Sequence, residues 1–243
     1  MKDYEKKIRF QEMDWDTDYF GVKSARVILN GNLTVKEWEN LKIQFKEYDF
    51  ISIQNQHSSP RNAQFIGRET SAFLADINIQ FIKVLNGLDS YPGEVEIDNS
   101  LKYEDQVQIE KIGDFKFSKF IEDPNLNKRG GNRVYTEWLI NAFKDSNKFF
   151  SLSRDENSNV NGYLLHSFKD DICVIELIAV SSDSSRLGIG TRLIKSLETS
   201  AFCKGIKKVK VGTQVRNIRA INFYHKSGYK QIECNQVYHL WNI

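Results

Sequence analysis

The chain has 243 residues, a formal net charge of +2 at pH 7, and 40% hydrophobic residues. This length accommodates one large domain or two small ones, and the composition is that of a globular protein. The small net charge argues against nucleic acid as an obligate partner, and no apolar run approaches the length of a membrane-spanning helix. Because residues 1–7 also lack the apolar region of a signal peptide, the sequence predicts a cytoplasmic protein with no membrane partner.

The first third of the chain has the pattern of an α/β unit. An aromatic segment leads into an extended stretch over residues 25–29. Thr34 and Glu37 then form a capping box, and apolar residues at intervals of three and four predict a helix after it. Residues 50–53 and 73–85 have the apolar and alternating patterns of strands.

A dense run of turn-forming residues at 86–93 marks the expected domain boundary. It divides an N-terminal α/β domain, residues 1–95, from a second domain, residues 96–243. Residues 112–132 are polar and basic, and they predict a mobile loop with a short helix before it.

The middle of the chain predicts a helix followed by a hairpin. Residues 134–143 place their apolar side chains on one helical face. Residues 149–152 and 162–166 have the pattern of two antiparallel strands around a polar turn.

The cysteines and histidines do not suggest a cross-link or a metal centre. Cys173, Cys203 and Cys234 form no C-x-x-C pair, so they are expected to be small buried hydrophobes. The four histidines are scattered and lack metal-binding spacing, so no metal site is expected.

A phosphate-binding turn is predicted in the last third of the chain. An apolar strand at residues 174–180 runs into a glycine-containing turn, Ser185 to Thr191, that opens an amphipathic helix. Backbone N–H groups at a helix N-terminus have no intrahelical partner and lie at the positive end of the helix dipole, so a diphosphate can bind several of them. Gly188 and Gly190 keep side chains away from such a ligand. This short motif is weak by itself.

A second strand is predicted over residues 209–215, with a short helix after it. Asn217 suits the N-cap of this helix and Gly228 its C-terminal stop. Helical spacing places Ala220 and Tyr224 on one side, so Tyr224 is expected to face inward, toward the first strand.

The order strand, glycine turn, helix, strand, followed by the motif N-x-x-A-x-x-F-Y-x-x-x-G-[FY] at residues 217–229, resembles the acyl-CoA core of the GNAT N-acyltransferase superfamily. Ser185 departs from the pattern, because the family usually has Gln or Arg there, and Arg186 follows one place later. The resemblance implies an α/β fold, in which a central mixed, twisted sheet is flanked by helices, with a smaller N-terminal α/β unit.

Further segments narrow the resemblance to the dTDP-amino-sugar N-acetyltransferases of bacterial surface-polysaccharide pathways, of the dTDP-fucosamine acetyltransferase type. These segments are residues 15–27, 118–120, 133–138, 213–217 and 238–241. The similarity spans nearly the whole chain but is poor between about residues 29 and 99, where the identity of the substrate could differ.

The resemblance implies that a coenzyme A thioester, acetyl-CoA or a hydroxyacyl-CoA, is the co-substrate. Its expected contacts lie at the end of the first strand, in the glycine turn and at the start of the last helix. They are Ile178, Ala179, Val180, Arg186, Leu187, Gly188, Ile189, Gly190, Thr191, Asn217 and Ala220.

Direct acyl transfer needs an acid for the leaving thiolate and a base for the amine. The resemblance places Tyr224 near the CoA sulfur as the acid, and a core tyrosine that only packs its ring is the alternative. Glu176 is a carboxylate within an otherwise apolar strand, where burial would raise its pKa and suit a base, but alternation can equally point it at solvent. A water relay is therefore the default base. No cysteine lies in a motif with a base, so no covalent intermediate is expected.

A nucleotide-linked sugar offers a diphosphate to cations and a thymine ring to aromatic side chains. The expected contacts are Lys119, Arg133, Tyr135 and Glu137 from the middle of the chain, with Trp15 and Phe20 from the N-terminal segment.

The sequence thus predicts an N-acyltransferase that moves an acetyl or short hydroxyacyl group from acyl-CoA to the amine of a dTDP-linked 3- or 4-amino-dideoxyhexose. The product would serve lipopolysaccharide O-antigen or a related surface polysaccharide, and the resemblance suggests a homodimer. Two alternatives stay open. One is a GNAT enzyme that acts on a protein α-amine or a polyamine, which would need an acidic groove, and the other is a non-catalytic acyl-CoA sensor.

Overall fold

The computed structural model describes residues 6–87, 95–113 and 115–243. Within these ranges, ten strands form one mixed sheet in the order β1-β2-β3-β10-β4-β9-β8-β7-β6-β5. The strands are β1 (Ile8–Glu12), β2 (Ser24–Leu29), β3 (Phe50–Asn55), β4 (Phe73–Val84), β5 (Glu96–Asp98), β6 (Lys148–Arg154), β7 (Val160–Lys169), β8 (Ile172–Val180), β9 (Lys208–Gln214) and β10 (Lys230–Trp241). The helices are α1 (Asp14–Phe20), α2 (Val35–Phe45), α3 (Pro60–Glu69), α4 (Tyr103–Ile112), α5 (Lys119–Glu122), α6 (Pro124–Asn127), α7 (Val134–Ala142), α8 (Ile189–Cys203) and α9 (Ile218–Lys226). The predicted α/β class, a mixed sheet flanked by helices, is confirmed.

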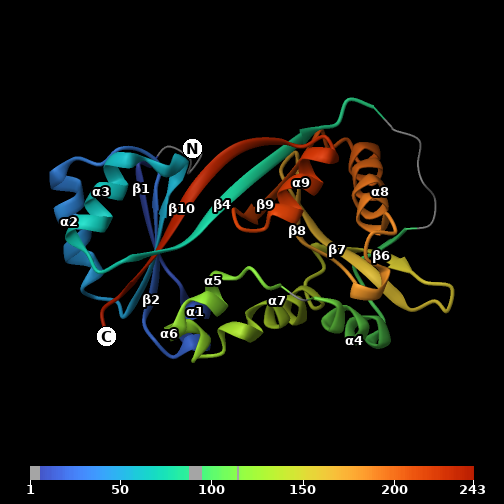
Figure 1. Ribbon diagram of the computed structural model, residues 1–243, viewed down its shortest axis with the longest axis horizontal. Coiled ribbons are helices and arrows are strands. Elements are labelled where there is room, and N and C mark those ends of the chain that lie inside the picture. The colour runs from blue at the N-terminus through green and yellow to red at the C-terminus, as the bar shows by residue number, and fades with distance from the viewer. Residues whose placement is uncertain (1–5, 88–94, 114) are drawn as a thin grey trace.

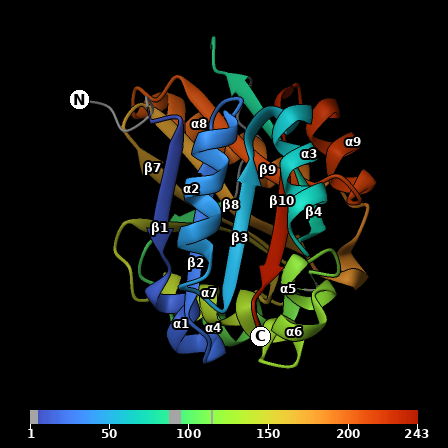
Figure 2. The same cartoon turned by 90° about the vertical axis from the view of Figure 1, so that its left-hand side faces the viewer.

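The N-terminal part is a small sheet covered by two helices. β1 pairs antiparallel with β2, and β2 pairs parallel with β3. α2 and α3 lie side by side over these strands (Figure 2). The capping box is confirmed, because Thr34 accepts from the N–H of Glu37 while the Glu37 side chain accepts from the N–H of Thr34. Trp38, on the covered face of α2, is fully buried and donates from Nε1 to Glu69.

The long strands β4 and β10 join the two parts of the molecule, and they run between them in Figure 1. β10 pairs antiparallel with β4 along most of its length and with β3 through its second half, while β4 pairs with β9 on its other side. The sheet therefore continues across the predicted division between residues 1–95 and 96–243. That division stays a prediction, and most of the turn-forming run at 86–93 lies outside the described residues.

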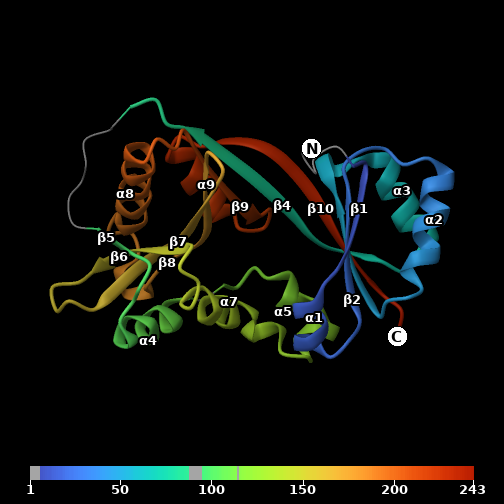
Figure 3. The same ribbon diagram turned by 180° about the vertical axis from the view of Figure 1, so that it is seen from behind.

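A layer of short helices lies on one side of the sheet, where Figures 1 and 3 show α1, α4, α5, α6 and α7. The prediction of a mobile loop over residues 112–132 is wrong, because α5 and α6 form within it. Asp123 organises this segment: its carboxylate accepts from two N–H groups at the start of α6 and lies 2.6 Å from Nδ1 of His239. Trp241 Nε1 donates to the same carboxylate at 3.0 Å. These buried contacts anchor the helical layer to β10.

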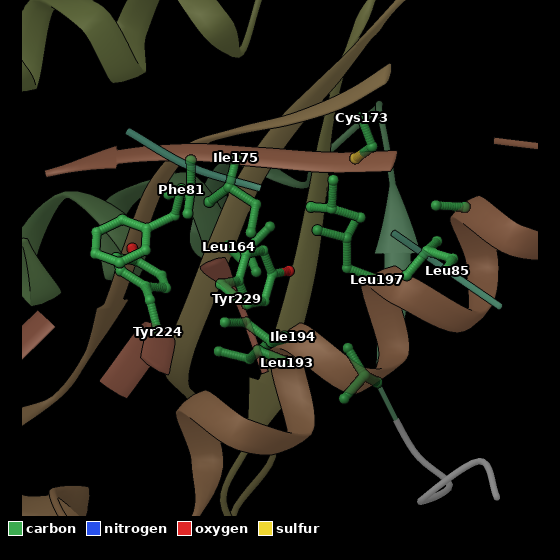
Figure 4. Packing of buried hydrophobic residues seen from close by; sticks show 14 of the residues in the cluster. Phe81, Leu85, Leu164, Cys173, Ile175, Leu193, Ile194, Leu197, Tyr224 and Tyr229 are labelled. Carbon is green, nitrogen blue, oxygen red and sulfur yellow. The ribbon is translucent and has the colours of Figure 1, made fainter. Parts of the chain in front are cut away.

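α8 and α9 pack on the opposite side of the sheet and enclose the largest core cluster, part of which is drawn in Figure 4. Cys173 belongs to this core, but Cys203 is exposed and Cys234 only half-buried, so the expectation of three buried cysteines is corrected. Cys203 sits at the last position of α8, where the helix surface meets solvent. Among the described helices, none combines the length and apolar character that crossing a membrane requires.

Candidate active site

The parallel strands β8 and β9 separate near their middle. Their pairing runs from Ile172 with Lys208 to Ile175 with Val211, although β8 continues to Val180 and β9 to Gln214. The register between β7 and β8 skips Glu176, so Glu176 is the extra residue of a β-bulge. A bulge bends its strand, and this one lies where the two strands part.

The bulge also changes which face of the sheet each β8 residue meets. Before it, Ile175 packs in the cluster of α8 and α9; after it, Leu177 packs against α4 and α7, on the other face. The end of β8, which holds the predicted contacts Ile178, Ala179 and Val180, thus borders β9 across a gap in the ladder. The main-chain N–H and C=O groups of β8 that face this gap have no partner on β9. They are therefore available to hydrogen-bond the amides of a ligand that lies between the two strands.

The glycine turn has the geometry expected of a phosphate site. Gly188 has φ of +78° and is the N-cap of α8, and no side chain caps this helix end. The first N–H groups of α8, from Ile189 to Thr191, therefore point into the turn at the positive end of the helix dipole. Arg186 also has a positive φ, of +70°, which is uncommon for a residue with a side chain.

Three features of this turn were not predicted from the sequence. Arg219, in the first turn of α9, donates to Ser185 Oγ at 2.7 Å, so α9 supplies a cation at the position where the motif departs from its usual Gln or Arg. Arg192 donates to the carbonyl of Leu187 at 3.1 Å and brings a second guanidinium to the turn. Gly162 of β7 allows the close approach of α8, because a Cβ there would lie 2.8 Å from the side chain of Ile189.

The start of α9 follows the prediction in its local structure. Asn217 is the N-cap, and its side chain accepts from the N–H of Ala220 at 3.1 Å. That amide oxygen is therefore already engaged within the helix, which leaves the Nδ2 of Asn217 for any contact with coenzyme A. Gly190 meets the ring of Phe223, where an added Cβ would lie 3.3 Å away, so α8 and α9 touch beside the turn.

Tyr224 faces inward as predicted and is 3% exposed. Its ring lies next to Phe81, with centroids 5.5 Å apart, and also contacts Tyr229 (Figure 4). Burial raises the pKa of Tyr224, so its hydroxyl keeps its proton throughout the physiological range. The packed ring and a proton-donating hydroxyl are compatible, and the acid role stays a prediction.

Glu176 does not share a face with Tyr224. Its side chain is 9% exposed and forms an ion pair with Lys148 of β6. It also accepts from Ser167 Oγ at 2.5 Å and from Trp138 Nε1 at 3.3 Å. These contacts lie at the bulge and engage the Glu176 carboxylate, and its role as a base stays a prediction beside the water relay.

A cavity of about 240 Å³ lies between β4, the end of β9 and α5. Its lining residues are Leu74, Ala75, Asp76, Ile77, Phe117, Ser118, Lys119, Glu122, Gln214, Val215 and Arg216. Enclosure by protein lowers the pKa of Lys119 to about 8, and repulsion from Arg26 adds to the shift, while Asp76 and Asp16 oppose it. Burial raises the pKa of Asp76, and Lys119 opposes that shift. The cavity therefore holds a cation and an anion that are both half-buried.

The structure brings only some of the predicted substrate residues to this cavity. Lys119 lines it, and the hydroxyl of Tyr135 accepts from Gln214, a lining residue, at 3.5 Å. Arg133, whose side chain is 68% exposed, pairs with Glu137 at 3.4 Å outside the lining.

The two aromatic residues of α1 that were predicted to contact substrate differ in exposure. Trp15 is partly exposed and stacks on Tyr19, with centroids 4.7 Å apart. Phe20 is 4% exposed and packs on Phe120 of α5, and its contact with substrate stays a prediction. Asp76 and Arg216 line the cavity but were not predicted as site residues, although the polar–apolar alternation of residues 76–81 was visible in the sequence.

The chain is similar in sequence and in fold to known acetyltransferases. Residues 117–229 match the model of the acetyltransferase (GNAT) family, and solved GNAT structures share the fold of nearly the whole chain. The chain therefore contains a GNAT acetyltransferase domain, as the sequence predicted, and enzymes with this fold use acyl-CoA.

Among relatives, the chain is 25% identical over 199 residues to the spore coat polysaccharide biosynthesis protein SpsD of Bacillus subtilis, covering 82% of this chain and 68% of SpsD. It is 35% identical over 81 residues to the uncharacterized protein YxbD of the same organism, covering 33% of this chain and about half, 49%, of YxbD.

Two solved structures illustrate the similarity of fold. A GCN5-related N-acetyltransferase from Sphaerobacter thermophilus has a TM-score of 0.66 at 10% identity, covering 97% of this chain and 76% of that one. A tandem GNAT protein from the clavulanic acid biosynthesis pathway has a TM-score of 0.60 at 12% identity, covering 90% of this chain and 75% of that one.

Proposed function

We propose that this protein is an N-acyltransferase that moves an acetyl or short hydroxyacyl group from acyl-CoA to the amine of a dTDP-linked 3- or 4-amino-dideoxyhexose. The observation that carries the sugar-nucleotide part is the half-open cavity beside the separated strands, where the ammonium group of the half-buried Lys119 can bind a diphosphate. The similarity to SpsD, named for polysaccharide biosynthesis, supports the same class of acceptor.

The residues of the chain fit a direct transfer. In this proposal the N–H groups at the start of α8 bind the diphosphate of coenzyme A, and the open edge of β8 from Leu177 to Val180 binds its amides and polarises the thioester carbonyl. The Tyr224 hydroxyl donates a proton to the leaving thiolate. Water takes the proton of the amine, because Glu176 is held in its ion pair.

A covalent intermediate on cysteine is disfavoured by the same geometry. Burial raises the pKa of Cys173 to about 12, so this thiol is not ionised near neutral pH. Cys203, at the end of α8, lies at the opposite end of the helix from the glycine turn. Neither of these two cysteines suits a nucleophile, so the proposal keeps a direct transfer from thioester to amine.

The wider setting is part of the proposal. Acyl-CoA and nucleotide sugars are both cytoplasmic metabolites, so we place the reaction in the cytoplasm, in the synthesis of a bacterial surface polysaccharide such as O-antigen. Residues 1–95 would complete the acceptor site and residues 96–243 bind acyl-CoA, and the active form would be a homodimer.

The test is release of free thiol by the purified protein. It is given acetyl-CoA or hydroxybutyryl-CoA with each member of a panel of dTDP-3-amino- and dTDP-4-amino-dideoxyhexoses, and a parallel series holds spermidine and a peptide with a free α-amine. Turnover with one sugar pairing supports the proposal and identifies both substrates. If only a polyamine or a peptide is acylated, or acyl-CoA binds without any turnover, the sugar assignment is wrong.

The charge of the cavity favours the sugar acceptor over a polyamine. Lys119 and Arg216 line it together with Asp76 and Glu122, so it is not an acidic groove. Arg216 and Glu122 also pair with each other at 2.7 Å, which balances their charges.

A further inference from the structure

A stripe of polar side chains crosses the central strands of the sheet. In β4, Asp76, Asn78 and Gln80 alternate with apolar residues, so they share one face. The register places Gln214 of β9 opposite Asn78, and Gly212 opposite Gln80, which extends this face onto β9. The apolar residues between them, such as Ile79, turn to the core under α8 and α9.

This face is not an ordinary solvated surface. It is on the central strands and looks toward the layer of short helices, as the contact of Gln214 with Tyr135 of α7 shows. Asp76, at one end, lines the cavity that contains Lys119. The amides of Asn78 and Gln80 are half-buried, and Gln80 Nε2 donates to Asn78 Oδ1, which fixes their orientation. Amide groups held in this way are suited to recognise hydroxyls, because each can both donate and accept.

The other end of the stripe lies at the gap between β8 and β9. Gly212 is the first residue of β9 after Val211, where pairing with β8 ends. The side chain of Gln80 lies across Gly212, because a Cβ there would fall 2.4 Å from Gln80 Nε2. A glycine at this point is therefore what allows the amide to reach the place where the thioester would lie.

The length of the stripe fits one acceptor orientation. Gln80 lies four residues along the strand from Asp76, a span of about 14 Å. A sugar ring with a diphosphate on its anomeric carbon can extend from the gap to Lys119 over this span. Its amine then lies at the thioester end and its phosphates lie at the cationic end.

We propose that Asn78, Gln80 and Gln214 form the sugar subsite of the acceptor, with the amine of a nucleoside-diphosphate hexose at Gly212 and its diphosphate at Lys119. This inference rests on the proposed function and adds to it the residues that distinguish a sugar ring from the nucleotide alone. It assigns specificity to β4, which lies in the stretch where resemblance to the sugar-nucleotide enzymes is poor.

The test compares binding of dTDP with binding of the dTDP-amino-dideoxyhexose that gives turnover, by calorimetry on the full chain. Gln80→Ala and Asn78→Ala should each weaken binding of the sugar nucleotide about tenfold, since a lost hydrogen bond in an enclosed site has roughly this effect, and leave dTDP binding unchanged. Lys119→Ala should weaken both ligands. Gln54→Ala, at a half-buried amide of β3, is the matched control and should change neither.

Two further variants keep the test decisive. Gln80→Met preserves the length of the side chain and removes the amide, so it separates lost hydrogen bonding from lost packing. Gly212→Ala should act like Gln80→Ala, because its methyl group displaces the amide. Each variant is checked by its thermal unfolding midpoint.

The outcomes separate the two proposals. If the wild-type protein binds and acylates a sugar nucleotide but Gln80→Met and Asn78→Ala bind it as tightly as wild type does, the subsite is wrong and the proposed function stands. If wild type binds and acylates no sugar nucleotide, the proposed function itself is wrong and the subsite is rejected with it. A selective loss of sugar-nucleotide binding supports both.

Discussion

Lys119 provides the sharpest test of diphosphate binding, because the protonation of its amine and the binding of the diphosphate should each favour the other. Its pKa is lowered to about 8 by enclosure in protein and by Arg26, against the attraction of Asp76 and Asp16. A diphosphate placed against the ammonium group brings negative charge, so it restores the charged form and raises the pKa toward that of an ordinary lysine, about 10.4. Ligand binding should therefore take up a proton from solution.

The size of this uptake follows from the two pKa values. At pH 8 about half of the free protein lacks the proton on Lys119, so binding takes up about 0.5 proton per site. The same calculation gives about 0.1 proton at pH 7 and about 0.9 at pH 9, and affinity for the diphosphate falls about tenfold from pH 7 to pH 9.

The assay is titration calorimetry with dTDP-glucose, whose diphosphate diester does not change charge over this range, in pairs of buffers that differ in ionisation enthalpy. Lys119→Arg is the control, because a guanidinium keeps its charge at these pH values while it still binds phosphate. The variant should bind without proton uptake and with an affinity that changes little with pH. Equal uptake by wild type and Lys119→Arg, or no binding by wild type, would refute the coupling.

Three further predictions follow. Tyr224→Phe should lower kcat about 100-fold or more while the Kd for acyl-CoA stays within about twofold, because only the donated proton is lost; unchanged turnover in the thiol-release assay would remove the acid assignment. His166 is fully buried and its pKa is lowered to about 4, chiefly by burial, so the unfolded chain binds the proton first as pH falls. This one group should lower the free energy of unfolding by roughly 3 kcal/mol between pH 6.5 and pH 4. Urea denaturation at several pH values should show that His166→Leu lacks this contribution. If the variant and wild type lose stability equally over this range, the reasoning is wrong. Gly131→Ala should destabilise the fold by about 2 kcal/mol or more, because its Cβ would lie 2.0 Å from the carbonyl oxygen of Phe120, and an unchanged thermal midpoint would show that this turn moves freely.

The elements that the sequence predicted well are those specified by neighbouring residues. The capping box of α2, the N-cap of α9 at Asn217 and the glycine turn before α8 depend on local main-chain chemistry, which a short motif describes fully. The proposed phosphate site could be predicted for the same reason, because it consists of consecutive N–H groups at one helix end.

The predictions that failed depend on partners far along the chain. Residues 112–132 look like a loop until Asp123 finds His239 and Trp241, more than 100 positions away. Nothing in the local pattern indicates that Glu176, at the bulge, pairs with Lys148. Alternation shows that residues share a face but does not say what covers that face.

The cavity that contains Lys119 could be predicted only in part. Lys119 was predicted from the resemblance, but the cavity around it is assembled from β4, the end of β9 and α5, which are separate in the sequence. The polar alternation of β4 was legible, yet only the register with β9 shows that its amides reach the gap beside β8.

The shared sheet has a consequence for how the protein is made. Asn55 of β3 and Gln236 of β10 are hydrogen-bonded although 181 residues separate them. During translation β3 is exposed on that side while the whole acyltransferase domain is still being synthesised, since β10 leaves the ribosome only after α9. A strand edge that remains unpaired throughout this time can pair with other chains. The N-terminal part thus depends on β10 for its own completion, and nascent chains stalled before residue 230 should be substrates for chaperones.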